Sequence, residues 1–144
     1  MKKLVLICFF SSLFGTSFAQ EQTPKSAIIS FFEAFHKQDT LGLKQMCHEE
    51  LILKTIKNTK EGTQLVTENF DDFLVSIGSI PSTMQFEEKI LDYKIEQDGN
   101  LAHVWTPYTF YINGKFSHQG VNAFTLYYEN GKWLIIHLID TRRK

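Results

Sequence analysis

Residues 101–142, LAHVWTPYTFYINGKFSHQGVNAFTLYYENGKWLIIHLIDTR, predict three consecutive β-strands. Asn113-Gly114 and Asn130-Gly131 interrupt runs that are rich in aromatic and β-branched residues. Such Asn-Gly pairs supply the positive φ angles that two-residue hairpin turns require. The stretch therefore indicates an antiparallel meander, which a further turn at Asp98-Gly99 extends to a fourth strand, expected over residues 84–97.

The residues before this meander predict three helices and one more strand. Thr23 and Pro24 suit the cap and the first position of a helix, and apolar residues then recur at helical spacing as far as Phe35. Asp39 and Thr67 are placed to cap two later helices. The expected helices are 24–36, 40–47 and 68–78, and the additional strand is 51–57. This order predicts an α+β fold with three N-terminal helices on one face of an antiparallel sheet.

Residues 1–19 have the features of a secretory signal peptide. Lys2 and Lys3 form a charged start, and residues 4–14 form an apolar run too short to span a bilayer. Ser17 and Ala19 place small residues at the positions that signal peptidase reads. The alternative is a buried N-terminal helix. We expect cleavage after Ala19, export to the periplasm or out of the cell, and a single mature domain at 20–144.

The charge of the chain argues against nucleic acid and anionic membranes as partners. Without Lys2 and Lys3 the formal charge falls from −1 to −3, whereas both partners need a basic face. Cys47 is the one cysteine outside the signal peptide, so we expect no disulfide within the mature domain. Its apolar neighbours favour a buried packing thiol over a catalytic one.

No motif in the chain fixes a reaction. The sequence lacks a phosphate-binding loop, a Cys-x-x-Cys pair and a His-Glu-x-x-His helix. By strand alternation, His103, His118 and His137 fall on three different strands of the outer sheet face, where they do not converge on one ion. We therefore expect neither a metal nor a cofactor.

The expected register of the meander brings polar residues together at one end of the helix-facing side. The Asn113-Gly114 turn pairs Tyr108 with Gln119, and the Asn130-Gly131 turn pairs Gln119 with Arg142. Polar groups at the end of an apolar chamber suit a small-molecule site. The candidate ligand contacts are Tyr108, Gln119, Asp140 and Arg142, with Phe32 and Phe35 on the opposite wall. The alternative is an Asp140–Arg142 salt bridge that closes the core, and Pro107 is a candidate bulge that would shift the register.

The same register predicts an apolar cluster on the outer face of the sheet. Its members are Trp105, Phe124, Leu126, Trp133, Ile135 and Ile139. A monomer would leave these side chains in water, so we expect a homodimer through this face.

Two segments give the chain a resemblance to a known superfamily. They are IISFFEAF at 28–35, on the first helix, and GKWLI at 131–135, which opens the last strand. With the order of elements between them, they resemble the nuclear transport factor 2-like superfamily, including its SnoaL-like and ketosteroid-isomerase-like branches. The resemblance implies a curved sheet around the first helix, a conical internal cavity, and dimers through the outer sheet face. The isomerases use an Asp base with Tyr and protonated Asp donors, but no catalytic residue carries over, because Phe31 and Phe32 occupy the expected tyrosine position.

Three functions remain open from the sequence. The favoured one is an exported domain that binds a small, partly apolar or aromatic molecule in the cavity. The second is a cofactor-independent isomerase, dehydratase or cyclase, with Asp140 as base and Tyr108 as hydrogen-bond donor. Arg142 counts against this assignment, because an adjacent cation lowers the pKa of an aspartate. The third is a non-catalytic dimeric assembly module.

Overall fold

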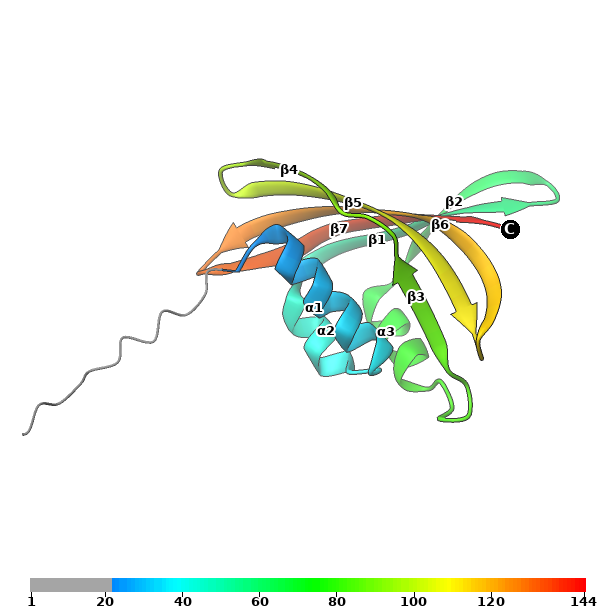
Figure 1. Ribbon diagram of the computed structural model, residues 1–144. Helices are drawn as coiled ribbons and strands as arrows, with labels where there is room; N and C mark the ends of the chain where they lie inside the picture. The colour runs from blue at the N-terminus through cyan, green and yellow to red at the C-terminus, as the bar shows by residue number, and fades with distance from the viewer. Residues whose placement is uncertain (1–21) are drawn as a thin grey trace, which may run out of the picture.

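In the computed structural model, residues 22–144 form three helices and a seven-stranded sheet that curves around them (Figure 1). The helices lie against the concave face of the sheet. This arrangement confirms the predicted α+β class and the cone shape. The predicted signal peptide, residues 1–19, lies outside the described residues.

The three helices begin at the kinds of cap that the sequence predicts. Their bounds are α1 Pro24–His36, α2 Thr40–Met46 and α3 Phe70–Gly78. Side chains of Thr23 and Asp39 accept hydrogen bonds from the first turns of α1 and α2. Asn69, not Thr67, caps α3, because residues 62–68 form a strand that was not predicted from the sequence. Within the described residues, no helix is both long and apolar enough to cross a membrane.

The strands form one mixed sheet in the order β2-β1-β7-β6-β5-β3, with β4 also paired to β5. The pair β1–β7 is parallel and the other pairs are antiparallel. The bounds are β1 Cys47–Thr59, β2 Gly62–Glu68, β3 Phe86–Ile90, β4 Lys94–Asp98, β5 Leu101–Ile112, β6 Lys115–Glu129 and β7 Lys132–Arg143.

The strand predicted over residues 84–97 is divided into β3 and β4. Both halves pair with the same edge of β5, β4 with its first half and β3 with its second half. The interruption lies opposite Pro107, whose carbonyl oxygen accepts a hydrogen bond of 2.8 Å from Leu91 N. Since proline has no N–H to donate, an irregular partner strand at this point is expected. The pairing of β5 with β6 continues through Pro107 without a shift.

Two bulges elsewhere overturn the predicted register of β6. Phe110 pairs with His118 and Tyr111 with Phe116, so Ser117 is an extra residue in β6. A second shift leaves Ile136 as an extra residue in β7. One extra residue moves the following side chains to the opposite face of a strand. Four members of the predicted outer cluster are therefore buried in the core: Phe124, Leu126, Trp133 and Ile135.

The core lies between α1 and the middle of the sheet. The rings of Phe31 and Phe32 meet Phe124 edge to face, with centroids 5.7 and 5.9 Å away. Such aromatic pairs add about 0.5–1.5 kcal/mol beyond the burial of their area. Cys47 is buried at the edge of this core, and burial raises the pKa of its thiol to about 12. The prediction of a packing thiol is thereby confirmed.

Candidate functional site

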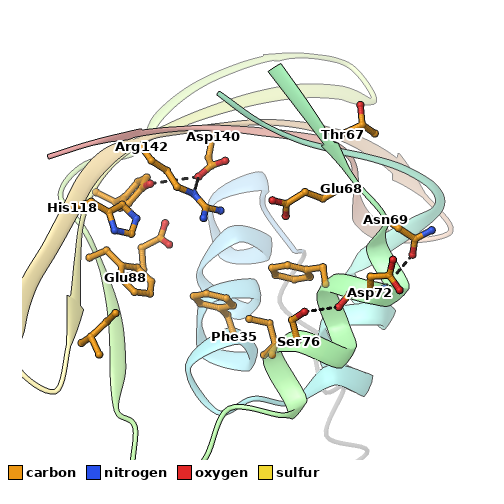
Figure 2. A pocket seen from close by; sticks show the side chains of 15 residues that line it. Phe35, Thr67, Glu68, Asn69, Asp72, Ser76, Glu88, His118, Asp140 and Arg142 are labelled. Carbon is orange, nitrogen blue, oxygen red and sulfur yellow. Dashed lines mark hydrogen bonds and ion pairs between the residues drawn. The ribbon is translucent and has the colours of Figure 1, made fainter. Parts of the chain in front are cut away.

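A cavity of about 710 Å³ opens between the helices and the curved end of the sheet. Side chains from α1, α3, β2, β3, β5, β6 and β7 line it (Figure 2). A narrower void of about 70 Å³ shares Phe35, Glu88 and Asp140 with it and is also lined by Phe31 and Phe32 of α1. The sheet curvature thus leaves a space beside the core, in the size range of small-molecule sites.

Aromatic and aliphatic side chains form much of the cavity wall. Phe35 of α1 and Phe73 of α3 stack nearly parallel, with ring centroids 6.3 Å apart and an interplanar angle of 4°. Phe110 contributes from β5, where its ring stacks on His118 with centroids 4.8 Å apart. Ile77 and Ile112 complete the apolar part of the lining. This wall fits the flat or apolar body of an organic molecule.

Glu88 is a carboxyl group set into this wall from β3. Its Oε1 accepts a hydrogen bond of 2.7 Å from Asn122 Nδ2, and the same amide donates to Thr106 Oγ1 at 3.3 Å. Burial raises the pKa of Glu88 to about 7, and the charge of Asp140 acts in the same direction. The Asn122 bond and Arg142 oppose that shift. Glu88 can therefore accept or release a proton near neutral pH.

The backbone of Glu88 is held by α1. Its N–H donates to His36 Nε2 over 3.0 Å, which satisfies an edge group of β3. His36 must be unprotonated at Nε2 to accept this bond. Burial lowers the pKa of His36, although the charge of Glu87 opposes this effect. This hydrogen bond joins β3 to the last residue of α1 and so fixes the position of the Glu88 backbone relative to that helix.

Asp140 and Arg142 form an ion pair on the inward side of β7. Arg142 Nε donates to Asp140 Oδ2 at 2.8 Å, as Figure 2 shows. The pair that the sequence offered as an alternative does form, and both of its members also line the cavity. The Asp140 carboxylate is thus already engaged by a cation of the protein itself. Asp140 is therefore poorly placed for the catalytic role considered for it.

The hydroxyl of Tyr108 is engaged by the protein. It donates to the carbonyl oxygen of Thr141 at 2.9 Å and lies 3.5 Å from Asp140 Oδ2. Burial raises the pKa of Tyr108, with smaller contributions in the same direction from the charges of Asp140 and Glu88. To reach β7, the phenol crosses β6 at Gly120, where a Cβ would lie 2.8 Å from the hydroxyl oxygen. The missing side chain at Gly120 makes this crossing possible.

The structure brings together four of the six predicted contacts. Phe35, Tyr108, Asp140 and Arg142 line the cavity, and Phe32 lines the adjoining void. Gln119 does not join them. The Ser117 bulge turns it to the outer face, where it is exposed, so its predicted place in the chamber was wrong. The same bulge brings His118, predicted on the outer face, into the cavity lining. Whether any of these residues contacts a ligand stays a prediction.

Glu88 and Asn122 are site residues that the sequence did not predict. Asn122 was hidden by the wrong register of β6. Glu88 had a usable signal, because it stands between Phe86 and Ile90 on the inward side of an alternating strand. Within residues 22–144, no group of three or more His, Cys, Asp or Glu side chains could hold a metal ion.

Solved structures resemble this chain over most of its length at low sequence identity. The β subunit of a proposed aromatic-ring-hydroxylating dioxygenase from Novosphingobium aromaticivorans has a TM-score of 0.67 and 7% identity, covering 83% of this chain and 86% of that chain. A proposed dehydratase of the nuclear transport factor 2-like family from Streptomyces avermitilis has a TM-score of 0.61 and 12% identity, covering 82% and 91%. A nuclear transport factor 2-like protein of unknown function from Cytophaga hutchinsonii has a TM-score of 0.52 and 17% identity, covering 87% and 94%.

These likenesses define the class of fold. The chain has the nuclear transport factor 2-like fold, as its sequence resemblance implies. No family model matches the sequence, and no curated protein matches it.

Proposed function

We propose that this protein is an exported domain that binds a small, partly aromatic molecule in its cavity. The observation that carries the proposal is the convergence of Glu88, Asn122 and the Asp140–Arg142 pair at an aromatic-walled space. Apolar walls supply the affinity of such a site, and a few fixed polar groups orient the ligand. Export rests on the signal-peptide features of residues 1–19, and a mature mass beginning after Ala19 would support it.

Filling the cavity tests the binding proposal. Ser76 is an exposed residue of α3 that lines the cavity, whereas Val75 beside it is exposed and lies outside the cavity lining. Ser76→Trp should therefore abolish binding of aromatic fragments found by a solution screen, and Val75→Trp should leave their affinity unchanged. Unaltered binding to the Ser76→Trp variant would contradict the proposal.

A second candidate function is cofactor-independent acid–base catalysis in the same cavity. The observation that favours it is the Glu88 carboxyl, whose pKa is raised to about 7. A general base with a pKa near the operating pH is effective. Glu88 therefore replaces Asp140 as the base of this hypothesis. A carbonyl-containing substrate panel tests it: turnover by the wild type that Glu88→Gln abolishes would support catalysis, and no turnover would leave binding as the function.

We also propose that the domain forms a homodimer through the outer face of the sheet. Four of the six residues expected in the outer cluster belong to the core, so they cannot support this assembly. Other apolar side chains keep that face partly apolar: Ile52, Leu101, Trp105 and Tyr127 are 50%, 54%, 41% and 38% exposed.

A further inference from the structure

We propose that the ligand of the cavity is an organic cation, an amine with a flat apolar body, whose ammonium group pairs with Glu88. This inference rests on the proposed binding function and names the class of ligand. It follows from the charges that line the cavity, the rings that face it and the hydrogen bonds already made there.

The lining of the cavity carries an excess of negative charge. Its carboxyl side chains come from four different elements: Glu68, Asp72, Glu88 and Asp140. Arg142 is the only Lys or Arg side chain among the described residues that line it. His118 adds little positive charge, because burial, and next the neighbouring Arg142, lower its pKa. A ligand that is itself an anion would enter against this field.

The positive charge of Arg142 is already balanced by nearby carboxylates of the protein. Its Nε donates to Asp140 Oδ2 at 2.8 Å. Burial alone would lower the pKa of Arg142, but the charge and the hydrogen bond of Asp140 raise it, with smaller contributions from Tyr108 and then Glu68. The guanidinium is also close enough to Glu88 to lower the pKa of that carboxyl. Glu68 has a second cation beside it, Lys57, whose Nζ lies 3.5 Å from Glu68 Oε1. Arg142 is therefore left to Asp140 and Glu88, and the lining offers no net positive charge to a carboxylate or phosphate ligand.

Glu88 offers an open acceptor next to the aromatic wall. One of its two oxygens, Oε1, has a hydrogen-bond partner among the described residues, namely Asn122 Nδ2. Figure 2 shows its carboxyl group below Arg142 and close to His118, and Phe35 lines the same cavity from α1. An ammonium donates several hydrogen bonds and compensates the charge of an ionised carboxylate in a partly buried site.

The aromatic lining favours the same class of ligand. Phe35, Phe73 and Phe110 line the cavity together with the carboxyl groups. The faces of aromatic rings attract cations, and they also stack on flat apolar groups. An aromatic amine can stack on these rings and also be attracted to them through its positive charge. An aromatic acid can stack on them but lacks the attraction between a cation and the ring face.

Three indole compounds of matched shape test the inference. Tryptamine carries an ammonium group, tryptophol a neutral hydroxyl and indoleacetate a carboxylate. Amide chemical-shift titrations of the ¹⁵N-labelled full chain near neutral pH measure each affinity. Tryptamine should bind at least about tenfold more tightly than tryptophol, and indoleacetate most weakly.

Two glutamine substitutions identify the charge responsible. Glu88→Gln keeps an oxygen that can accept from Asn122, and it should weaken tryptamine about tenfold while leaving tryptophol unchanged. Glu96→Gln, at an exposed position of β4 outside the cavity lining, is the matched control and should change neither affinity.

The outcomes separate this inference from the binding proposal. Binding of tryptophol or indoleacetate at least as tight as that of tryptamine, and lost in Ser76→Trp, would overturn the cationic ligand and keep the binding function. Equal loss of tryptamine and tryptophol in Glu88→Gln would overturn the role of Glu88. Absence of binding by all three compounds at millimolar concentration would count against both proposals.

Discussion

Glu88 shows how one position on a strand can acquire unusual chemistry. It occupies an inward site between Phe86 and Ile90, where the alternation of β3 would otherwise place an apolar side chain. The pairing of β3 with β5 and the His36 contact hold the backbone of Glu88 in place, and so keep its side chain on the inward side of the strand. Burying an ionisable group favours its neutral form, and this is the main cause of its raised pKa.

The stability of the protein should therefore depend on the protonation of Glu88. The pKa of this carboxyl is 4.5 in the unfolded chain, the ordinary value for glutamate, and about 7 in the folded protein. Between these values folding takes up a proton, so the free energy of unfolding falls as the pH rises through this window. Replacing Glu88 by Gln removes the contribution of this carboxyl to the pH dependence of the free energy of unfolding. Between about pH 4.5 and pH 7, the stability of Glu88→Gln relative to the wild type should increase by about 3 kcal/mol.

Urea unfolding at several pH values measures this difference. Glu96→Gln serves as the control, because its side chain is exposed on β4, and its curve should run parallel to that of the wild type. A Glu88→Gln variant whose stability also runs parallel to the wild type would show that Glu88 is not buried as described.

At the scale of elements, the site depends on how β5, β6 and β7 lie side by side. Tyr108 of β5 reaches the Thr141 carbonyl of β7 because β6 has no side chain at Gly120. The hydroxyl of Thr141 meanwhile accepts from the Val121 N–H at 3.1 Å. At this crossing the Thr141 carbonyl therefore accepts from a side chain, and the Val121 N–H donates to a side chain in place of a backbone carbonyl. The Asp140–Arg142 pair lies beside it, with Asp140 Oδ2 3.5 Å from the Tyr108 hydroxyl.

Gly120→Ala should disrupt this crossing. The added Cβ would meet the Thr141 carbonyl group and the Tyr108 hydroxyl, and the two neighbouring strands leave little room for adjustment. We expect a loss of about 1–3 kcal/mol in the free energy of unfolding, the usual cost of overpacking. Gly78→Ala is the control. There the Cβ would meet one methyl group, that of Thr40 at 3.2 Å, and the effect on urea unfolding should be small. Equal stability of Gly120→Ala and wild type would contradict the description of this crossing.

The sequence predicts the elements of this fold better than it predicts their faces. Helix caps and hairpin turns are local signals, and Thr23, Asp39 and the two Asn-Gly turns lie where they are expected. The bulges at Ser117 and Ile136 have no Gly or Pro at the extra residue to mark them. Each inserts a single residue, which is enough to exchange the two faces of a strand. Gln119 and Phe124 were assigned to the wrong faces for this reason.

Some inward residues were nevertheless assigned correctly. Asp140 and Arg142 lie on the predicted face because the two bulges compensate for each other over the end of β7. Tyr108 precedes both bulges in the chain, and its face follows by alternation from Ala102 and Val104, which are buried in the core. Long-range register, not local conformation, was the missing information.

At the scale of the whole molecule, the curved sheet has one face occupied by helices and another open to its surroundings. A homodimer through the outer face would cover Trp105 and its apolar neighbours. Light scattering should then give the mass of two protomers for the wild type. Trp105→Glu should dissociate the dimer, whereas Val75→Glu, on the exposed side of α3, should not. A monomeric wild type would refute this assembly.

The claim that the cavity is the functional site is tested most directly by mapping where a small aromatic ligand binds. The measurement is an amide chemical-shift titration of the ¹⁵N-labelled wild type with tryptamine, with assigned resonances. The largest shifts should cluster at Phe35, Phe73, Glu88, Phe110 and Arg142, which line the cavity from both the helices and the sheet. Largest shifts on the outer face around Leu101 and Trp105, or no saturable shifts at all, would contradict the claim.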